Sequence, residues 1–243
     1  MGQTLARGLS ATGRFSIATL VDTNEPAELF GATYASTWDD VDAHSIDVVV
    51  DFSSPEGVVA SATWCAAHGV ALVVGTTGLS NEQRHTVEEA ATKVGVVIAA
   101  NFALGAVLSE KFAALAAPYF DRVEIIELHH DKKVDAPSGT SIAAAKNIAA
   151  ARSAAGLPEI VDPTVRHTVS GARGANTIGG VKIHSVRLPG LVAHQEILFG
   201  GPGEGLTIRH DSFDRLSFVQ GVALAADAID ATPRLIDGIE SLI

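Results

Sequence analysis

Residues 129–140 carry side chains that could hold an anion and move a proton. In order, they read His-His-Asp-Lys-Lys-Val-Asp-Ala-Pro-Ser-Gly-Thr. An imidazole with an ordinary pKa of ~6.5 can give or take a proton near neutrality. Lys132 and Lys133 add positive charge, and the backbone amides at the start of a helix bind anions. The spacing therefore predicts an acid–base site beside an anion-binding turn.

A strand and a helix must position this stretch. The apolar run 123–128 predicts a strand that ends at the two histidines, and an alanine-rich helix follows the Ser-Gly-Thr turn. Adjacent histidines in a strand point to opposite sides. No third ligand stands at a spacing typical of a zinc site, so we expect no metal.

The first hundred residues alternate between apolar strands and helices. This order is typical of right-handed βαβ units and a parallel sheet. The first strand, over 15–22, is expected to be buried and to end in a carboxylate. The predicted strands span 15–22, 46–52, 70–74 and 94–99, and the predicted helices between them span 55–68 and 80–92.

The pattern changes after a predicted helix at 104–117. Strands joined by Gly/Pro turns follow, which indicates antiparallel pairing, and a last helix at about 215–230 is expected to return to the first half. These strands span 180–187, 191–199 and 205–211.

The expected fold class is therefore α/β. A Rossmann-like, dinucleotide-binding domain with a parallel sheet is predicted for residues 1–102 and 215–243. An α+β domain with a largely antiparallel sheet, which would bind the substrate, is predicted for residues 103–214.

Composition excludes several classes of function. A net charge of −11 argues against a nucleic-acid partner, and the apolar runs are too short to span a membrane. The single cysteine, Cys65, cannot form an internal disulfide, is expected in the core, and fits a cytoplasmic protein. Residues 128–215 hold ten of the seventeen Lys and Arg but eight Asp and Glu. This local excess suits a small anionic ligand, although a solvated face explains it equally well.

Polar residues follow several of the predicted parallel strands. In a doubly wound sheet, ligands bind outside the carboxyl ends of the strands. Those ends are Asp22, Asp51–Ser53, Gly75–Gly78 and Ala99–Phe102. A carboxylate at position 22 can accept the ribose hydroxyls of an adenosine, and it would repel a 2′-phosphate. Each residue alone could equally cap a helix or form a turn, but four such ends in one sheet favour a dinucleotide site.

Taken together, these residues resemble the dihydrodipicolinate reductase family of the diaminopimelate route to lysine. The segment Glu127–Thr140, with His129, His130 and Lys133, matches the family signature, and the resemblance covers the whole chain. Further matches are Asp51–Ser53, Gly75–Gly78, Ala100–Phe102, Arg173–Gly174 and Asp211–Arg215.

The chain departs from the family at its start. A dinucleotide fold is expected to open with a strand and a glycine-rich loop, and only Met1–Gly2 match that part. Residues 1–9 already suggest the helix that follows the loop. We therefore expect that the natural protein starts upstream of Met1.

The resemblance implies hydride transfer from NADH or NADPH to a cyclic imine dicarboxylate, 4-hydroxy-tetrahydrodipicolinate, with net loss of water. It implies His129 as proton donor or acceptor and Lys133 as a second acid. It also implies a homotetramer joined through the antiparallel strands. The implied substrate contacts are His130, Ser138, Gly139 and Thr140. The implied cofactor contacts are Met1, Asp22, Gly75, Thr76, Thr77, Ala99, Ala100, Asn101 and Phe102.

Alternatives stay open. The chain could be another NAD-dependent dehydrogenase of amino or imino acids, or a non-catalytic relative that binds a dicarboxylate. Asp22 followed by Thr23 favours NADH slightly over NADPH. Arg215 is expected either to reach a ligand or to form an ion pair. The remaining histidines expected at the surface or in strand pairing are His167, His184, His194 and His210.

Overall fold

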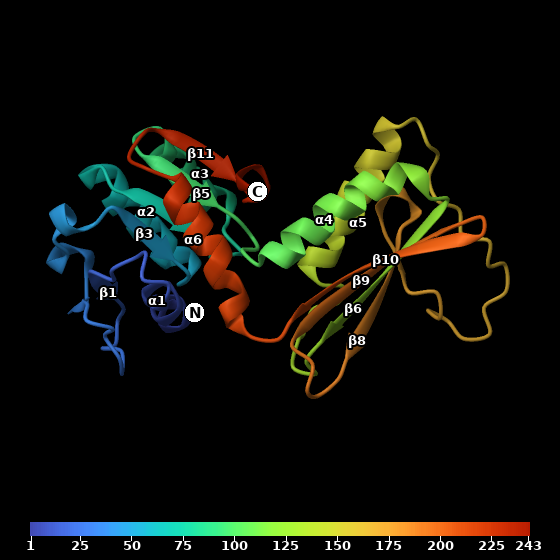
Figure 1. Ribbon diagram of the computed structural model, residues 1–243, viewed down its shortest axis with the longest axis horizontal. Helices are drawn as coiled ribbons and strands as arrows, with labels where there is room; N and C mark the ends of the chain where they lie inside the picture. The colour runs from blue at the N-terminus through green and yellow to red at the C-terminus, as the bar shows by residue number, and fades with distance from the viewer. The chain divides into compact units, whose positions relative to one another are not determined.

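The computed structural model describes residues 1–243 and divides into two compact units (Figure 1). Unit 1 comprises Met1–Leu104 and Arg215–Ile243, and unit 2 comprises Gly105–Asp214. The first boundary lies two residues beyond the expected one, and the second lies where it was expected. None of the helices combines the length and hydrophobicity that crossing a bilayer requires.

Unit 1 contains a four-stranded parallel sheet in the order β11–β5–β4–β3. Every residue of β4 and β5 is buried, as expected for strands covered on both faces. The strands are β3 (Val48–Asp51), β4 (Ala71–Val74), β5 (Gly95–Ile98) and β11 (Arg234–Asp237). Apolar runs predicted the first three, whereas β11 is mostly exposed and gave no such signal.

Local signals set the bounds of the helices beside this sheet. Ser54 caps α2 (Pro55–His68), which ends where Gly69 takes a left-handed φ of 73°. A capping box at Ser80 opens α3 (Asn81–Ala91). Both helices were predicted to within a residue. Together with the sheet they enclose an apolar core that contains Cys65, as expected.

A second, two-stranded sheet lies in unit 1. Its strands, β1 (Thr19–Val21) and β2 (Thr33–Ala35), pair in parallel with each other only. The expectation of a buried strand over 15–22 was wrong: β1 has three residues, and all are only partly buried. The physical reason is that β1 has a neighbouring strand on one side only, since β1 and β3 do not pair.

Two helices at the ends of the chain pack together in unit 1. α1 (Gly2–Ala11) opens the chain, as predicted. The helix predicted at 215–230 is a 3₁₀ turn, η5 (Arg215–Phe218), followed by α6 (Val219–Ala228). A Cβ on Gly8 would lie 2.4 Å from Cγ2 of Val219, so glycine is what permits this close approach.

Unit 2 is a five-stranded mixed sheet in the order β10–β9–β6–β8–β7, with α4 and α5 packed on one face (Figure 1). Only β6 and β8 pair in parallel, so the sheet is largely antiparallel, as predicted. β9 and β10 pair with each other as expected, but the expected pairing of β8 with β9 was wrong, because β6 lies between them. The core between the sheet and the helices includes Ile125 and Ile148. The elements are α4 (Leu104–Ala116), β6 (Arg122–His129), α5 (Gly139–Ala154), β7 (Ala175–Asn176), β8 (Lys182–Arg187), β9 (Ala193–Gly201) and β10 (Glu204–Ser212).

Candidate active site

Strand β6 places a carboxylate and an imidazole at the end of an apolar face. Side chains alternate along a strand, so Val123, Ile125, Glu127 and His129 share the face that meets α5. The first two join the core, and Glu127 is fully buried beyond them. His129 closes the strand with its side chain 15% exposed. The strand therefore holds a buried acid directly beneath a nearly buried histidine.

Glu127 is surrounded by donors. Nδ1 of His129 lies 2.5 Å from Oε2, and the two terminal nitrogens of Arg187 donate to the two carboxylate oxygens at 2.8 Å each. The backbone amide of Ser138 donates to Oε1 at 3.3 Å. Burial by itself would raise the pKa of Glu127, but hydrogen bonds from Arg187, Ser185 and His129, led by Arg187, outweigh it and hold the pKa below its ordinary value. Glu127 is therefore an ionised acceptor.

The environment of His129 favours a neutral ring. Burial lowers the pKa of His129, and the charges of Lys133 and Arg187 lower it further against the opposing effect of Glu127. Because an ionised carboxylate only accepts, the hydrogen bond assigns the proton to Nδ1. Nε2 is then the nitrogen that can exchange a proton with a ligand.

The loop after β6 holds the second predicted acid. Nζ of Lys133 donates to both carboxylate oxygens of Asp135, at 2.7 and 2.8 Å. Arg187 also donates to the backbone carbonyl of Asp135 at 2.7 Å. Lys133 is mostly buried, whereas Lys132 and His130 are exposed. The two groups predicted to move protons thus belong to one connected network.

The start of α5 lies beside the same network. Ser138 is the N-cap: its Oγ accepts the amide of Ser141 at 3.2 Å, and Ser141 in turn donates to Gln195 at 2.5 Å. The hydroxyl of Ser138, which the resemblance implied as a substrate contact, is engaged in capping the helix. Gly139 is exposed and Thr140 partly so, and they begin the helix where amides can receive an anion.

Two of the other histidines of unit 2 are paired with carboxylates. His184 on β8 pairs with Glu124 at 2.7 Å, and His194 on β9 pairs with Asp211 at 2.7 Å. His210 lies in β10 and His167 in an exposed loop. Their placement in strands or at the surface agrees with the sequence prediction.

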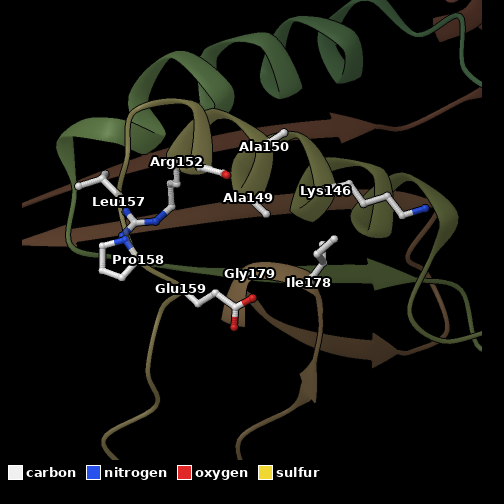
Figure 2. A pocket seen from close by; sticks show the side chains of 10 residues that line it. Lys146, Ala149, Ala150, Arg152, Leu157, Pro158, Glu159, Ile178 and Gly179 are labelled. Carbon is white, nitrogen blue, oxygen red and sulfur yellow. The ribbon is translucent and has the colours of Figure 1, made fainter.

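A hollow of about 360 Å³ lies elsewhere in unit 2, between α5 and residues 157–159 and 178–179 (Figure 2). Figure 2 shows Arg152 beside Leu157 and Pro158. Arg152 donates to the carbonyls of Ala117 and Phe120, so it ties α5 to the turn that follows α4. None of the predicted site residues lines this hollow.

Unit 1 carries the predicted cofactor residues, and Asp51 organises two of its strand ends. At the end of β3, the Asp51 carboxylate accepts the amide and hydroxyl of Ser53 at 2.9 and 2.7 Å and the hydroxyl of Ser61 at 2.6 Å. It also accepts the hydroxyl of Thr76, beyond β4, at 3.1 Å. One buried carboxylate therefore holds the turn after β4 against β3.

The residues of unit 1 fit a dinucleotide. Met1 is the N-cap of α1 and provides no side-chain cap, which leaves the first amides of the helix available to phosphates. Asp22 is exposed at the end of β1, where it accepts the amide of Asn24 at 3.1 Å. Ala99 and Phe102 are buried, so any contact from them must come through the backbone. Gly75, Thr76, Thr77, Ala100 and Asn101 lie at least partly exposed at the strand ends.

Sequence reasoning missed Glu127 and Arg187 as members of the site. A signal for Glu127 was available, because a residue two before His129 in a strand must share its face. Arg187 gave no local signal, since only the parallel pairing of β6 with β8 sets it opposite His129.

The chain is similar to known proteins along its whole length. Its residues 1–102 match the family model for the dihydrodipicolinate reductase N-terminus, and residues 105–242 match that for the C-terminus. The 4-hydroxy-tetrahydrodipicolinate reductase of Cutibacterium acnes is 46% identical, covering 96% of each chain. That of Mycolicibacterium gilvum is also 46% identical, covering 100% of this chain and 94% of the relative.

A solved structure supports the same relationship. Dipicolinate-bound dihydrodipicolinate reductase from Paenisporosarcina sp. TG-14 is 38% identical, covers 100% of this chain and 95% of its own, and has a TM-score of 0.87. The amine dehydrogenase of Mycobacterium smegmatis, at 13% identity, coverage of 98% and 92% and a TM-score of 0.57, shares the fold alone. The chain belongs to the dihydrodipicolinate reductase family.

Proposed function

We propose that this chain reduces 4-hydroxy-tetrahydrodipicolinate to tetrahydrodipicolinate with release of water, using NADH in preference to NADPH. The observation that carries the proposal is the His129–Glu127 pair beside Lys133 and the open start of α5. That arrangement joins a proton donor to an anion-binding turn, which is the combination that an unsaturated dicarboxylate requires. Family membership supplies the reaction class.

In the proposed mechanism, unit 2 holds and protonates the substrate. The amides of Gly139 and Thr140, with the Thr140 hydroxyl, bind one carboxylate, and His130 contacts the ring or its second carboxylate. Two negative groups beside His129 favour its charged form, so binding raises its pKa toward neutrality. Nε2 of His129 then gives a proton to the ring as hydride adds. Lys133 serves as the second acid and also balances the substrate charge.

Unit 1 would hold the dinucleotide through the first amides of α1, Asp22 and the strand ends at Thr76 and Asn101. A bound reduced nicotinamide supplies the hydride. With one hydride and one proton gained, the ring loses its hydroxyl group as water, so the reaction balances.

The preference for NADH rests on Asp22. An exposed carboxylate at the end of β1 repels a 2′-phosphate, and Arg7, a cation of the same unit, is paired with Glu28. A unit charge pair at about 4 Å in water is worth ~1 kcal/mol, or roughly fivefold in affinity. Asp22→Ala should therefore raise the affinity for NADPH severalfold relative to the affinity for NADH, as measured by equilibrium titration. An unchanged ratio of the two affinities would contradict this preference.

The test of the activity uses freshly prepared substrate and follows NADH oxidation by absorbance. We expect turnover by the wild type, and a loss of roughly 10²-fold or more in kcat for Lys133→Ala, the size typical of a lost proton donor. Lys132→Ala is the matched control, because Lys132 is exposed one residue away, and it should behave like wild type. Dipicolinate binding without turnover would identify a non-catalytic relative instead.

We also propose a homotetramer in the cytoplasm, as the family resemblance implies. Light scattering of the purified chain gives the assembly mass directly. A monomeric mass at micromolar concentration would refute the tetramer.

A further inference from the structure

We infer that Glu127, clamped by Arg187, is the positioning residue for His129: it fixes the ring orientation and tautomer and stabilises the imidazolium formed during turnover. The inference rests on the proposed function, because it assigns to Glu127 a role in the proton transfer by His129. Neither Glu127 nor Arg187 touches the substrate in the proposed mechanism.

The geometry around Glu127 distinguishes its contact with His129 from an ordinary ion pair. Glu127 is fully buried, and each of its oxygens is occupied by protein donors: Oε2 by His129 and Arg187, and Oε1 by Arg187 and Ser138. Hydrogen bonds to both oxygens prevent the carboxylate from rotating, so the 2.5 Å bond to Nδ1 fixes the plane of the imidazole. Nε2 is thereby aimed away from the core.

Arg187 determines which group holds the proton. A buried carboxylate next to an imidazolium could take the proton back, which would end its use in catalysis. The bidentate guanidinium makes that transfer unfavourable, because it stabilises the carboxylate in its charged form. Arg187 thus keeps Glu127 an acceptor while His129 cycles between its two protonation states.

Arg187 also connects the two predicted acids. It lies opposite His129 in the parallel pairing of β6 with β8, and paired residues of neighbouring strands point to the same face. From there it donates to the carbonyl of Asp135, whose carboxylate holds the ammonium group of Lys133. One guanidinium therefore sets the positions of His129, through Glu127, and of Lys133, through Asp135.

Strand β6 offers a matched control. On its opposite face, Glu124 binds Arg173 and His184, so it forms a second Arg–Glu–His cluster of the same chemistry. That cluster includes none of the predicted site residues. Glu124→Gln should cost stability but leave kcat close to wild type, whereas Glu127→Gln removes the same charge beneath His129.

The experiment combines steady-state kinetics with ¹⁵N NMR of the histidine side chains. For Glu127→Gln we expect kcat to fall by roughly 10²-fold or more with little change in KM. The Nδ1-protonated tautomer of His129 should lose population. The pKa of its imidazolium should fall, because the substitution removes the carboxylate that favours the charged ring, while Lys133 and Arg187 continue to disfavour it. Equal kcat in Glu127→Gln and Glu124→Gln, or an unchanged tautomer, would overturn the inference.

A folding defect is handled by a second variant. Removing one partner of a buried pair leaves an unpaired charge, whereas Glu127→Gln/Arg187→Gln leaves a neutral pair of hydrogen-bonding groups. We expect this double variant to fold, as judged by circular dichroism, and still to lose kcat; wild-type activity would refute the inference. If the wild type shows no turnover, the proposed function fails, while the tautomer measurement still decides the role of Glu127.

Discussion

Replacing Asp51 with alanine should remove the hydrogen bonds that hold the end of β3 to the turn after β4 and should destabilise unit 1. The carboxylate accepts four hydrogen bonds, from Ser53, Ser61 and Thr76. Bonds to a charged group contribute about 1.5–3 kcal/mol each, so the gross loss is large. The net loss is smaller, because each donor can bond to another acceptor or to water once the carboxylate is gone.

The structure allows that net loss to be worked out. Ser61 is the one fully buried donor, and its hydroxyl already lies 3.1 Å from the carbonyl of Val58, which can take over the bond. Ser53 is exposed and Thr76 partly so, which lets water replace the carboxylate. We therefore expect Asp51→Ala to lower the free energy of unfolding by about 2 kcal/mol, close to one charge-assisted bond. Asp51→Asn should lose about half as much, because its amide oxygen still accepts.

Urea unfolding followed by tryptophan fluorescence measures this change selectively. The two tryptophans of the chain, Trp38 and Trp64, both lie in unit 1, with ring centroids 5.0 Å apart. The exposed Asp39→Ala is the matched control and should stay within about 0.5 kcal/mol of wild type. Asp51→Ala and Thr76→Val should also be non-additive, since the two residues share a bond. A loss for Asp51→Ala no larger than that for Asp39→Ala would refute this reasoning.

Two further predictions concern packing and reactivity. Gly8→Ala places a methyl group 2.4 Å from Cγ2 of Val219, so it should destabilise unit 1 by about 1–3 kcal/mol. Gly2→Ala is the control and should not destabilise the unit, because Gly2 has open space around it. Equal urea midpoints for the two variants would contradict the packing of α1 on α6. Burial raises the pKa of Cys65 to about 12, so the native thiol should resist alkylation at pH 8 and react only when urea unfolds the chain. Rapid labelling of the native protein would contradict this, because it would mean that the core around Cys65 opens to the reagent.

Features encoded over short stretches were predictable from the sequence. Ser54 and Pro55 start α2, and Gly69 ends it. The continuous apolar runs of β4 and β5 predict strands that are buried on both faces. The order His129, Lys133 and Ser138 is also local, because a strand end, a loop and a helix cap follow one another along the chain. For that reason the candidate acids and the anion-binding turn could be predicted from the sequence alone.

Features that depend on partners distant in sequence were not predictable. β2 has three residues, which are too few for a periodic pattern. The expected burial of β1 was wrong, because full burial of a strand requires a neighbouring strand on each side and β1 has only one.

The sequence by itself determined the family, the order of the main helices and of most strands, and the identity of the candidate acids. Only the tertiary structure decided how those acids are held. Glu127 and Arg187 are 60 residues apart, and Asp51 and Thr76 are 25 apart. Each pair meets because two parallel strands end at one edge of a sheet. Strand pairing sets that register over the whole sheet, so no local pattern along the chain records which side chains become neighbours.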